Sequence, residues 1–344
     1  CVAHSPRDRA RASVAKDATA AFRRGVAAYS NARLFVHPAW KDVVARAGKV
    51  NDSVAAAPQA DWPQGDGSEG VLEGFSSSIF PDGSQPVRWT LRNDCIGEVS
   101  FPLALASVAE GGEQYARTAS NLNDYIYIHS PLAKGPRADP NNPAYGLVGW
   151  SYPGSEGVYY GDDNARSMLG TIGTAGVLKT DRWDEGVMRC LLANLRTTGK
   201  LGFRDSRIDQ KPLEKNGWRH YWNGERVNYA PHYEAYLWAC NLWAYHKTGY
   251  KPFLDLTKNA IRMTVAAYPD QWRWTNGIQQ ERARMLLPLA WLVRVEDTPE
   301  HREWLRKIAG EMLRFQDACG AIREELGAPG KGSYGPPRSN EEYG

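Results

Sequence analysis

The sequence predicts an all-α fold in which strongly apolar helices form an inner ring and amphipathic helices form an outer ring. From residue 93 onward, helical segments come in pairs. The first member of each pair has almost no polar face, whereas the second has a charged face. The turn within each pair is short, and the connection to the next pair is mostly long. Short turns are therefore expected at one end of the array and long, functional loops at the other.

Four helical pairs are visible in this array. The predicted inner helices cover residues 94–110, 162–178, 231–247 and 276–295, and their outer partners cover 113–129, 182–198, 251–268 and 300–318. Asp94, Asp163 and His232, near the starts of the first three inner helices, are equally spaced in the sequence. This spacing indicates an architectural repeat.

The residues before the array predict a smaller N-terminal part. Residues 7–32 have the pattern of one amphipathic helix, and residues 47–70 have the composition of a loop. Two extended runs flank the turn signal PDGS, which predicts a β-hairpin near residues 71–91. The chain is thus divided into a helix and linker (1–59), a loop with the hairpin (60–92) and the helical array (93–344), in one globular domain overall.

Composition excludes several classes of function. The net charge is +3 without a long basic run, so nucleic acid is not an expected partner, and no apolar stretch is long enough to span a membrane. The five cysteines are scattered without a CxxC spacing. Neither a disulfide framework nor a zinc site is therefore expected, and no metal or other cofactor is predicted.

The two ends of the sequence predict a fragment of a longer protein. The chain begins at Cys1 without a methionine and stops just after a loop rich in glycine and proline. The compartment stays open, with the periplasm or the exterior as the working guess.

The stretch YYGDDNARSMLG (159–170) is the centre of the expected site. It places Asp162 and Asp163 in the first turn of an inner helix, and Arg166 follows one turn later on the same face. One of the acids could be an N-cap, but a second acid and an arginine exceed what a cap requires. Because the rest of this helix is almost entirely apolar, these side chains are expected at the tip of a buried helix, within reach of a ligand.

The other inner helices also begin with polar side chains. RNDCIGE (92–98) supplies Asp94, APHYEA (230–235) supplies His232 and Glu234, and QQERAR (279–284) supplies Glu281 and Arg282. Structural salt bridges with neighbouring arginines are the plain alternative for any one of these acids.

Aromatic residues crowd the long loops that lead to these helix starts. Indole and phenol faces stack on the C–H faces of sugars, and their polar atoms can reach hydroxyl groups. The predicted substrate-contacting aromatic residues are Trp150, Tyr160, Trp222, Trp272 and Trp274. The alternative is that some of these tryptophans only pin long loops to the helices.

The helix pattern, the GDDNAR motif and the segment WTNGIQQERARMLLPLAWLVRV (274–295) resemble the (α/α) toroids of the six-hairpin glycosidase-like superfamily, in bacterial proteins of polysaccharide breakdown. The resemblance covers about residues 70–344. It implies a toroid that is incomplete in this chain, since four helical pairs are visible. It also implies a carbohydrate substrate, with glycoside hydrolysis as the leading expectation.

Glycoside hydrolysis requires two carboxyl groups flanking the scissile bond. Asp163, followed by Asp162, is the predicted ionised partner, because the positive end of a helix stabilises a carboxylate. Glu234 lies among aromatic residues and is the predicted acid, since desolvation raises the pKa of a carboxyl group. Glu281 completes the set of catalytic candidates.

Other reactions stay open on the same residues. Arg166, Arg219, His232 and Arg282 could clamp the carboxylate of a uronic acid. Tyr160, His232 and Tyr233 could serve a polysaccharide lyase. An epimerase of the same architecture would use histidine as acid and base. A non-enzymatic carbohydrate-binding repeat is the third alternative, and it would leave the paired acids without a task.

Overall fold

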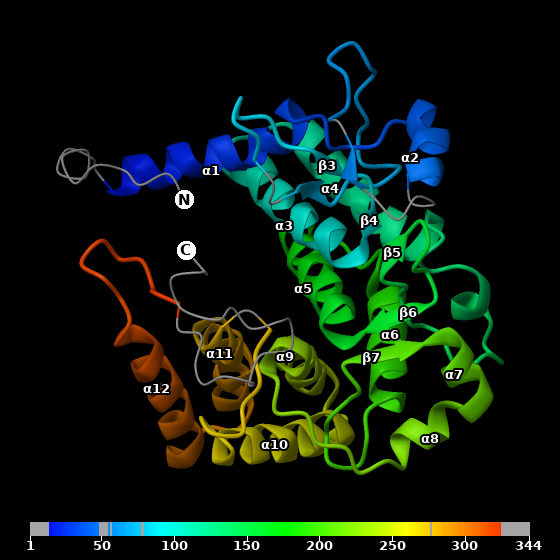
Figure 1. Cartoon of the computed structure of the whole chain (residues 1–344). Coiled ribbons are helices and arrows are strands. Elements are labelled where there is room, and N and C mark those ends of the chain that lie inside the picture. Colours follow the sequence, from blue (N-terminus) through cyan, green and yellow to red (C-terminus); the bar gives the residue numbers. More distant parts are fainter. Residues whose placement is uncertain (1–13, 48–53, 56, 77–78, 276, 325–344) are drawn as a thin grey trace. The chain divides into compact units, whose positions relative to one another are not determined.

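The computed structural model describes residues 14–47, 54–55, 57–76, 79–275 and 277–324 (Figure 1). The chain divides into two compact units. The first comprises residues 1–130, 151–154 and 170–183, and the second comprises residues 131–150, 155–169 and 184–344. Each unit is described by itself.

Helices dominate both units, as the sequence predicts. The paired helices are α3 (Asn93–Ala109) with α4 (Glu113–Asp124), α5 (Gly161–Leu178) with α6 (Asp184–Arg196), α9 (Pro231–Thr248) with α10 (Lys251–Ala266), and α11 (Ile278–Val295) with α12 (Pro299–Leu313). A π-helical turn at Tyr125–His129 extends α4 to the predicted end of that segment. The alternation of apolar and amphipathic helices therefore predicts the helix boundaries to within a few residues.

The first unit also holds the N-terminal elements. They are α1 (Val14–Asn31), a 3-10 turn at Pro38–Trp40, α2 (Lys41–Ala47), and a three-stranded antiparallel sheet in the order β1 (Val54–Ala55), β3 (Val87–Arg88) and β2 (Gly74–Phe75). Strands β2 and β3 are the predicted hairpin, whose turn is closed by a 2.9 Å hydrogen bond from Phe80 N to Ser84 O. Strand β1 lies in a stretch predicted as loop. Part of the predicted helix 7–32, residues 7–13, lies outside the described residues.

Close backbone contact explains one glycine of α5 in the first unit. A Cβ atom at Gly170 would lie 2.1 Å from the carbonyl oxygen of Gly97, so only glycine fits there. Near this contact, the hydroxyl groups of Ser100 and Thr174 are 3.0 Å apart. The apolar, glycine-containing face of α5 is therefore a packing surface, as its sequence predicts. The same unit contains a second strand pair, β4 (Leu91–Arg92) with β5 (Ser151–Tyr152).

In the second unit, α9 packs against α10 and α11, and α11 packs against α12. Their apolar faces enclose a core that includes Trp238, Trp272 and Leu289. The long loops carry short elements that sequence patterns did not predict, namely β6 (Val158–Tyr160) paired with β7 (Arg207–Asp209), α7 (Gln210–Asn216) and α8 (Trp218–Trp222). Strand β6 runs directly into α5 and thereby fixes the position of the acidic helix start.

None of the helices in the described part of the chain combines the length and the apolar character needed to cross a bilayer.

Candidate active site

Two helix starts in the second unit bring a histidine and a carboxylate together. Asp162 is the second residue of α5, and His232 is the second residue of α9. His232 Nε2 lies 3.5 Å from Asp162 Oδ2. The His232 side chain is 16% exposed and that of Asp162 is 4% exposed, so a ligand would reach the imidazole before the carboxylate.

Thr275 completes the surroundings of the imidazole. Its Oγ1 lies 2.7 Å from His232 Nδ1. Each ring nitrogen therefore has an oxygen beside it, and a protonated imidazole could donate toward both. An imidazole is a side chain that can both accept and donate a proton. Asp162, His232 and Thr275 are called the acid–base couple below.

Glu281 holds two members of this couple in place. Its carboxyl group accepts hydrogen bonds from the backbone N–H groups of His232 and, at 3.4 Å, of Thr275. The N-cap of α9 is Ala230, whose side chain cannot satisfy the free amides at a helix start. The first turn of α11 therefore supplies the cap for α9, and the same contact orients the imidazole.

Burial gives Glu281 an unusual titration. Loss of solvent raises its pKa to about 8, and the negative charge of Asp162 acts in the same direction. Arg284 and the two backbone donors oppose this rise. Glu281 is therefore mainly protonated at neutral pH beside the couple.

Glu234 lies on α9, where it anchors a loop. It is buried and accepts hydrogen bonds from Arg204 N at 3.1 Å and from Asn228 Nδ2 at 2.9 Å. Burial raises its pKa to about 8, as the sequence pattern predicts in direction. Burial also lowers the pKa of Arg204 to about 10. The carboxyl group of Glu234 thus ties the long loop 199–230 to the start of α9.

Four aromatic rings adjoin in series and end at the couple. Trp150 meets Tyr160 edge to face at 5.2 Å between ring centroids, and Tyr160 stacks on Tyr233 at 6.5 Å. Tyr233 in turn meets His232 at 4.8 Å. All four side chains are partly exposed. Of the predicted aromatic residues, Trp150 and Tyr160 are the ones that this series connects to the acid–base couple.

The remaining predicted tryptophans are placed differently. Trp272 is fully buried in the helical core and donates from Nε1 to Thr264 O at 2.8 Å. Its indole face packs against protein, so Trp272 is a core residue and its predicted contact with a substrate is not retained. Trp274 is also buried, at 4% exposure, whereas Trp222 is half-buried at the end of α8.

The other predicted charged residues form local pairs. Asp163 is buried and lies 4.0 Å from Arg166 on the same helix, in the predicted arrangement. Arg282 is buried and donates from Nε to the Tyr268 hydroxyl at 2.8 Å. Asp94 belongs to the first unit and is held by Arg92 through two hydrogen bonds of 3.0 and 2.8 Å.

Sequence reasoning did not assign a role to Asn164, which follows the two acids in the motif. Its side chain accepts from Val148 N at 3.2 Å and donates to Val148 O at 2.7 Å. Asn194 also donates to it at 3.1 Å. A fully buried asparagine is thus the residue that fastens the preceding loop to α5. Thr275, which carries no charge and lies outside the helices, likewise gave no sequence signal.

Within the described residues, histidine, cysteine, aspartate and glutamate side chains do not gather in groups of three or more that could hold a metal ion.

Comparison with known proteins shows the fold. No protein-family model matches the sequence, and no curated protein does. Among solved structures, a D-mannose isomerase is similar, with 8% identity, a TM-score of 0.52, and coverage of 79% of this chain and 76% of that one. A family 76 glycoside hydrolase from a bovine Bacteroides thetaiotaomicron strain has 10% identity and a TM-score of 0.48 over 68% of this chain. This chain spans 50% of the hydrolase chain.

The likeness to the isomerase confirms the predicted fold class, an all-α toroid. At this identity the comparison describes the fold alone.

Proposed function

We propose that this chain is the catalytic part of a carbohydrate-processing enzyme that transfers a proton on a sugar, as an isomerase or an epimerase does. His232 is the acid–base group in this proposal. The observation that supports it is the placement of a partly exposed imidazole between Asp162 and Thr275. Histidine titrates near neutral pH, which is the property that general acid–base catalysis requires.

The proposed reaction begins with a neutral His232. Nδ1 is held by Thr275, so Nε2 of the imidazole removes a proton from the sugar carbon beside a carbonyl group, and the electron pair moves into an enediolate. The Asp162 carboxylate stabilises the resulting imidazolium, and Thr275 fixes the ring through Nδ1. Return of the proton to the neighbouring carbon, together with passage of the hydroxyl proton to the former carbonyl oxygen, gives isomerisation. Its return to the other face of the same carbon would require a second acid.

The sugar class is supported by the aromatic series that leads to the couple. Trp150, Tyr160 and Tyr233 offer ring faces and polar atoms of the kind that contact sugar rings. The isomerase with the similar fold acts on D-mannose according to its name, and this agrees with a sugar substrate. Its low sequence identity leaves the choice of sugar to experiment.

Glycoside hydrolysis is the second candidate, and one observation favours it. Two carboxyl groups, Glu234 and Glu281, have pKa values raised to about 8, and the charge of Asp162 contributes to both shifts. A carboxyl group with a raised pKa is typical of the general acid of a glycosidase. We rank it second because both raised carboxyl groups are buried and accept hydrogen bonds from backbone N–H groups.

The two candidates are separated by incubating the protein with monosaccharides and oligosaccharides in D₂O and recording NMR spectra. Proton transfer predicts new carbon–deuterium bonds beside the carbonyl carbon, together with a new sugar. Hydrolysis predicts new reducing ends without such bonds. A lyase would instead produce the ultraviolet absorbance of an unsaturated uronate.

A further inference from the structure

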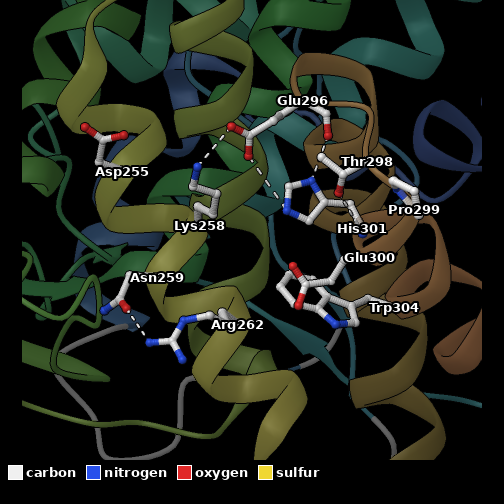
Figure 2. Close-up of a pocket in the computed structure, with 10 residues that line it drawn as sticks. All are labelled: Asp255, Lys258, Asn259, Arg262, Glu296, Thr298, Pro299, Glu300, His301 and Trp304. Atoms are coloured by element: carbon white, nitrogen blue, oxygen red, sulfur yellow. Dashed lines mark hydrogen bonds and ion pairs between the residues drawn. The ribbon is translucent and has the colours of Figure 1, made fainter.

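A hollow lies in the second unit, between α10 and the start of α12 (Figure 2). Its volume is about 620 Å³, within the range of small-molecule sites. Glu281 of the candidate active site is in the first turn of α11, whereas Glu296 of this hollow follows its last turn. Glu296 comes 15 positions after Glu281 in the chain, which corresponds to roughly 22 Å along the helix axis. The hollow is therefore separate from the acid–base couple.

Polar side chains of both signs line the two walls. Figure 2 shows Asp255, Lys258, Asn259 and Arg262 on α10, facing the turn and helix that carry the other lining residues. Lys258 Nζ lies 3.0 Å from Glu296 Oε1, which joins the two walls across the hollow. Within α10, Arg262 donates to Asn259 Oδ1 at 2.9 Å. These contacts place donors and acceptors on both walls.

The α12 wall contains a rigid aromatic surface. His301 is buried, and its Nδ1 lies 2.7 Å from the Glu296 carbonyl oxygen. A carbonyl oxygen can only accept, so Nδ1 carries the hydrogen and the ring orientation is fixed. Trp304 lies against His301 at 5.1 Å and also packs on the helical core. Its indole therefore offers a surface to a ligand with little further loss of side-chain freedom.

The balance of charges indicates the class of ligand. Three acids (Asp255, Glu296 and Glu300) stand beside two cations (Lys258 and Arg262), so a strongly anionic ligand would be repelled. A sugar residue presents hydroxyl groups that both donate and accept, and its C–H face suits an indole. We propose that this hollow is a second binding site, which docks a sugar residue of a neutral glycan away from the reaction site.

This inference rests on the carbohydrate substrate of the proposed function, but it does not depend on the proton-transfer reaction. The test is equilibrium binding of neutral hexasaccharides of mannose, glucose and xylose, measured by saturation-transfer NMR and calorimetry. The proposal predicts that at least one hexasaccharide binds wild type, and that Trp304→Ala and Arg262→Ala each weaken it about tenfold or more. Arg262 is exposed, so its variant tests the site without disturbing the core.

Two controls make the result specific. Trp291 packs against the same core cluster as Trp304 but does not line the hollow, so Trp291→Ala should leave binding unchanged. The variant His232→Gln should also retain hexasaccharide binding, even where it abolishes turnover. The proposal is overturned if none of the hexasaccharides binds, if Arg262→Ala and Trp304→Ala bind as wild type does, or if His232→Gln alone removes binding.

Discussion

The carboxyl group of Glu281, on α11, accepts a hydrogen bond from the backbone N–H of His232 at the start of α9. The two residues are 49 positions apart in the sequence. One helix therefore caps another, and the capped residue is also the one that we assign to acid–base chemistry. The contact joins the stability of the helix pair to the geometry of the site.

Removal of the Glu281 carboxyl group should destabilise the second unit. In Glu281→Ala, the N–H groups of His232 and Thr275 lose their acceptor, which costs about 1–3 kcal/mol for a buried donor. Glu281→Gln keeps one accepting oxygen and should lose less. Urea denaturation measures both variants, with Glu303→Ala as an exposed control expected to stay within about 0.5 kcal/mol. An unchanged midpoint for Glu281→Ala would contradict the capping role.

The raised pKa values of Glu234 and Glu281 predict how stability depends on pH. A carboxyl group titrates near 4.5 when unfolded, but these two titrate at about 8 when folded. Between these values the folded state binds more protons, so the stability they contribute is full below about pH 4.5 and is lost as the pH rises to about 8.

The comparison that isolates this effect is wild type against the double variant Glu234→Gln, Glu281→Gln. The unfolding free energy of wild type, relative to that of the double variant, should fall steadily between pH 5 and pH 8, a range that lies between about 4.5 and about 8. Parallel curves for the two proteins would show that these carboxyl groups are ionised throughout and would contradict the burial argument.

Asn164 should matter for folding more than the acids beside it. Asn164→Leu removes the two hydrogen bonds to Val148 and leaves buried backbone groups without partners, which we expect to cost about 2–4 kcal/mol. The exposed Asn141→Ala is the control, expected to change stability by less than about 0.5 kcal/mol. Thermal and urea unfolding test this, and a wild-type melting curve for Asn164→Leu would rule out the anchoring role.

Alanine variants of Trp150 and Trp272 should differ in their effects, because Trp150 lies beside the candidate site and Trp272 lies in the core. Trp272→Ala leaves a large cavity in the helical core and should cost about 3–5 kcal/mol. Trp150→Ala should cost less stability and should raise the KM for a sugar about three- to tenfold, because ring stacking contributes about 0.5–1.5 kcal/mol. Steady-state kinetics and melting curves distinguish the two. A raised KM for Trp272→Ala and a larger loss of stability for Trp150→Ala would instead support Trp272 as the substrate contact.

The helices could be predicted because each one carries its own signal. The apolar residues of α9 and α11, and the charged face of α12, define their boundaries with little reference to the rest of the chain. The GDDNAR motif also placed Asp162 and Asp163 correctly in the first turn of α5.

The site could be predicted only in part, because its contacts join distant segments. His232 and Thr275 are 43 residues apart, and their pairing depends on how the loop before α11 packs. The prediction of Trp272 as a sugar contact failed for the same reason, since its loop folds back so that the indole meets Thr264. Glu234 and His232 both lie in the first turn of α9, but Glu234 is buried whereas His232 is partly exposed. The sequence did not predict this difference in exposure.

Asparagine variants of the neighbouring residues Asp162 and Asp163 test which carboxylate belongs to the acid–base couple. Asp162→Asn removes the charge beside His232 Nε2 and should lower kcat about tenfold or more, with a shift in the pH profile of the reaction. Asp163→Asn changes an acid paired with Arg166 and should retain most of the activity. An inactive Asp163→Asn with an active Asp162→Asn would show that the couple was assigned to the wrong acid.

The most direct test of the proposed function is the rate at which deuterium from D₂O enters the carbon beside the sugar carbonyl, measured by NMR for wild type and His232→Gln. General acid–base catalysis contributes a factor of about 10²–10⁴ in rate. The exchange rate of His232→Gln should therefore be at least about a hundredfold lower than that of wild type, while its melting temperature stays near that of wild type. Equal exchange in both proteins, or release of new reducing ends by wild type without any carbon–deuterium bond, would contradict the account.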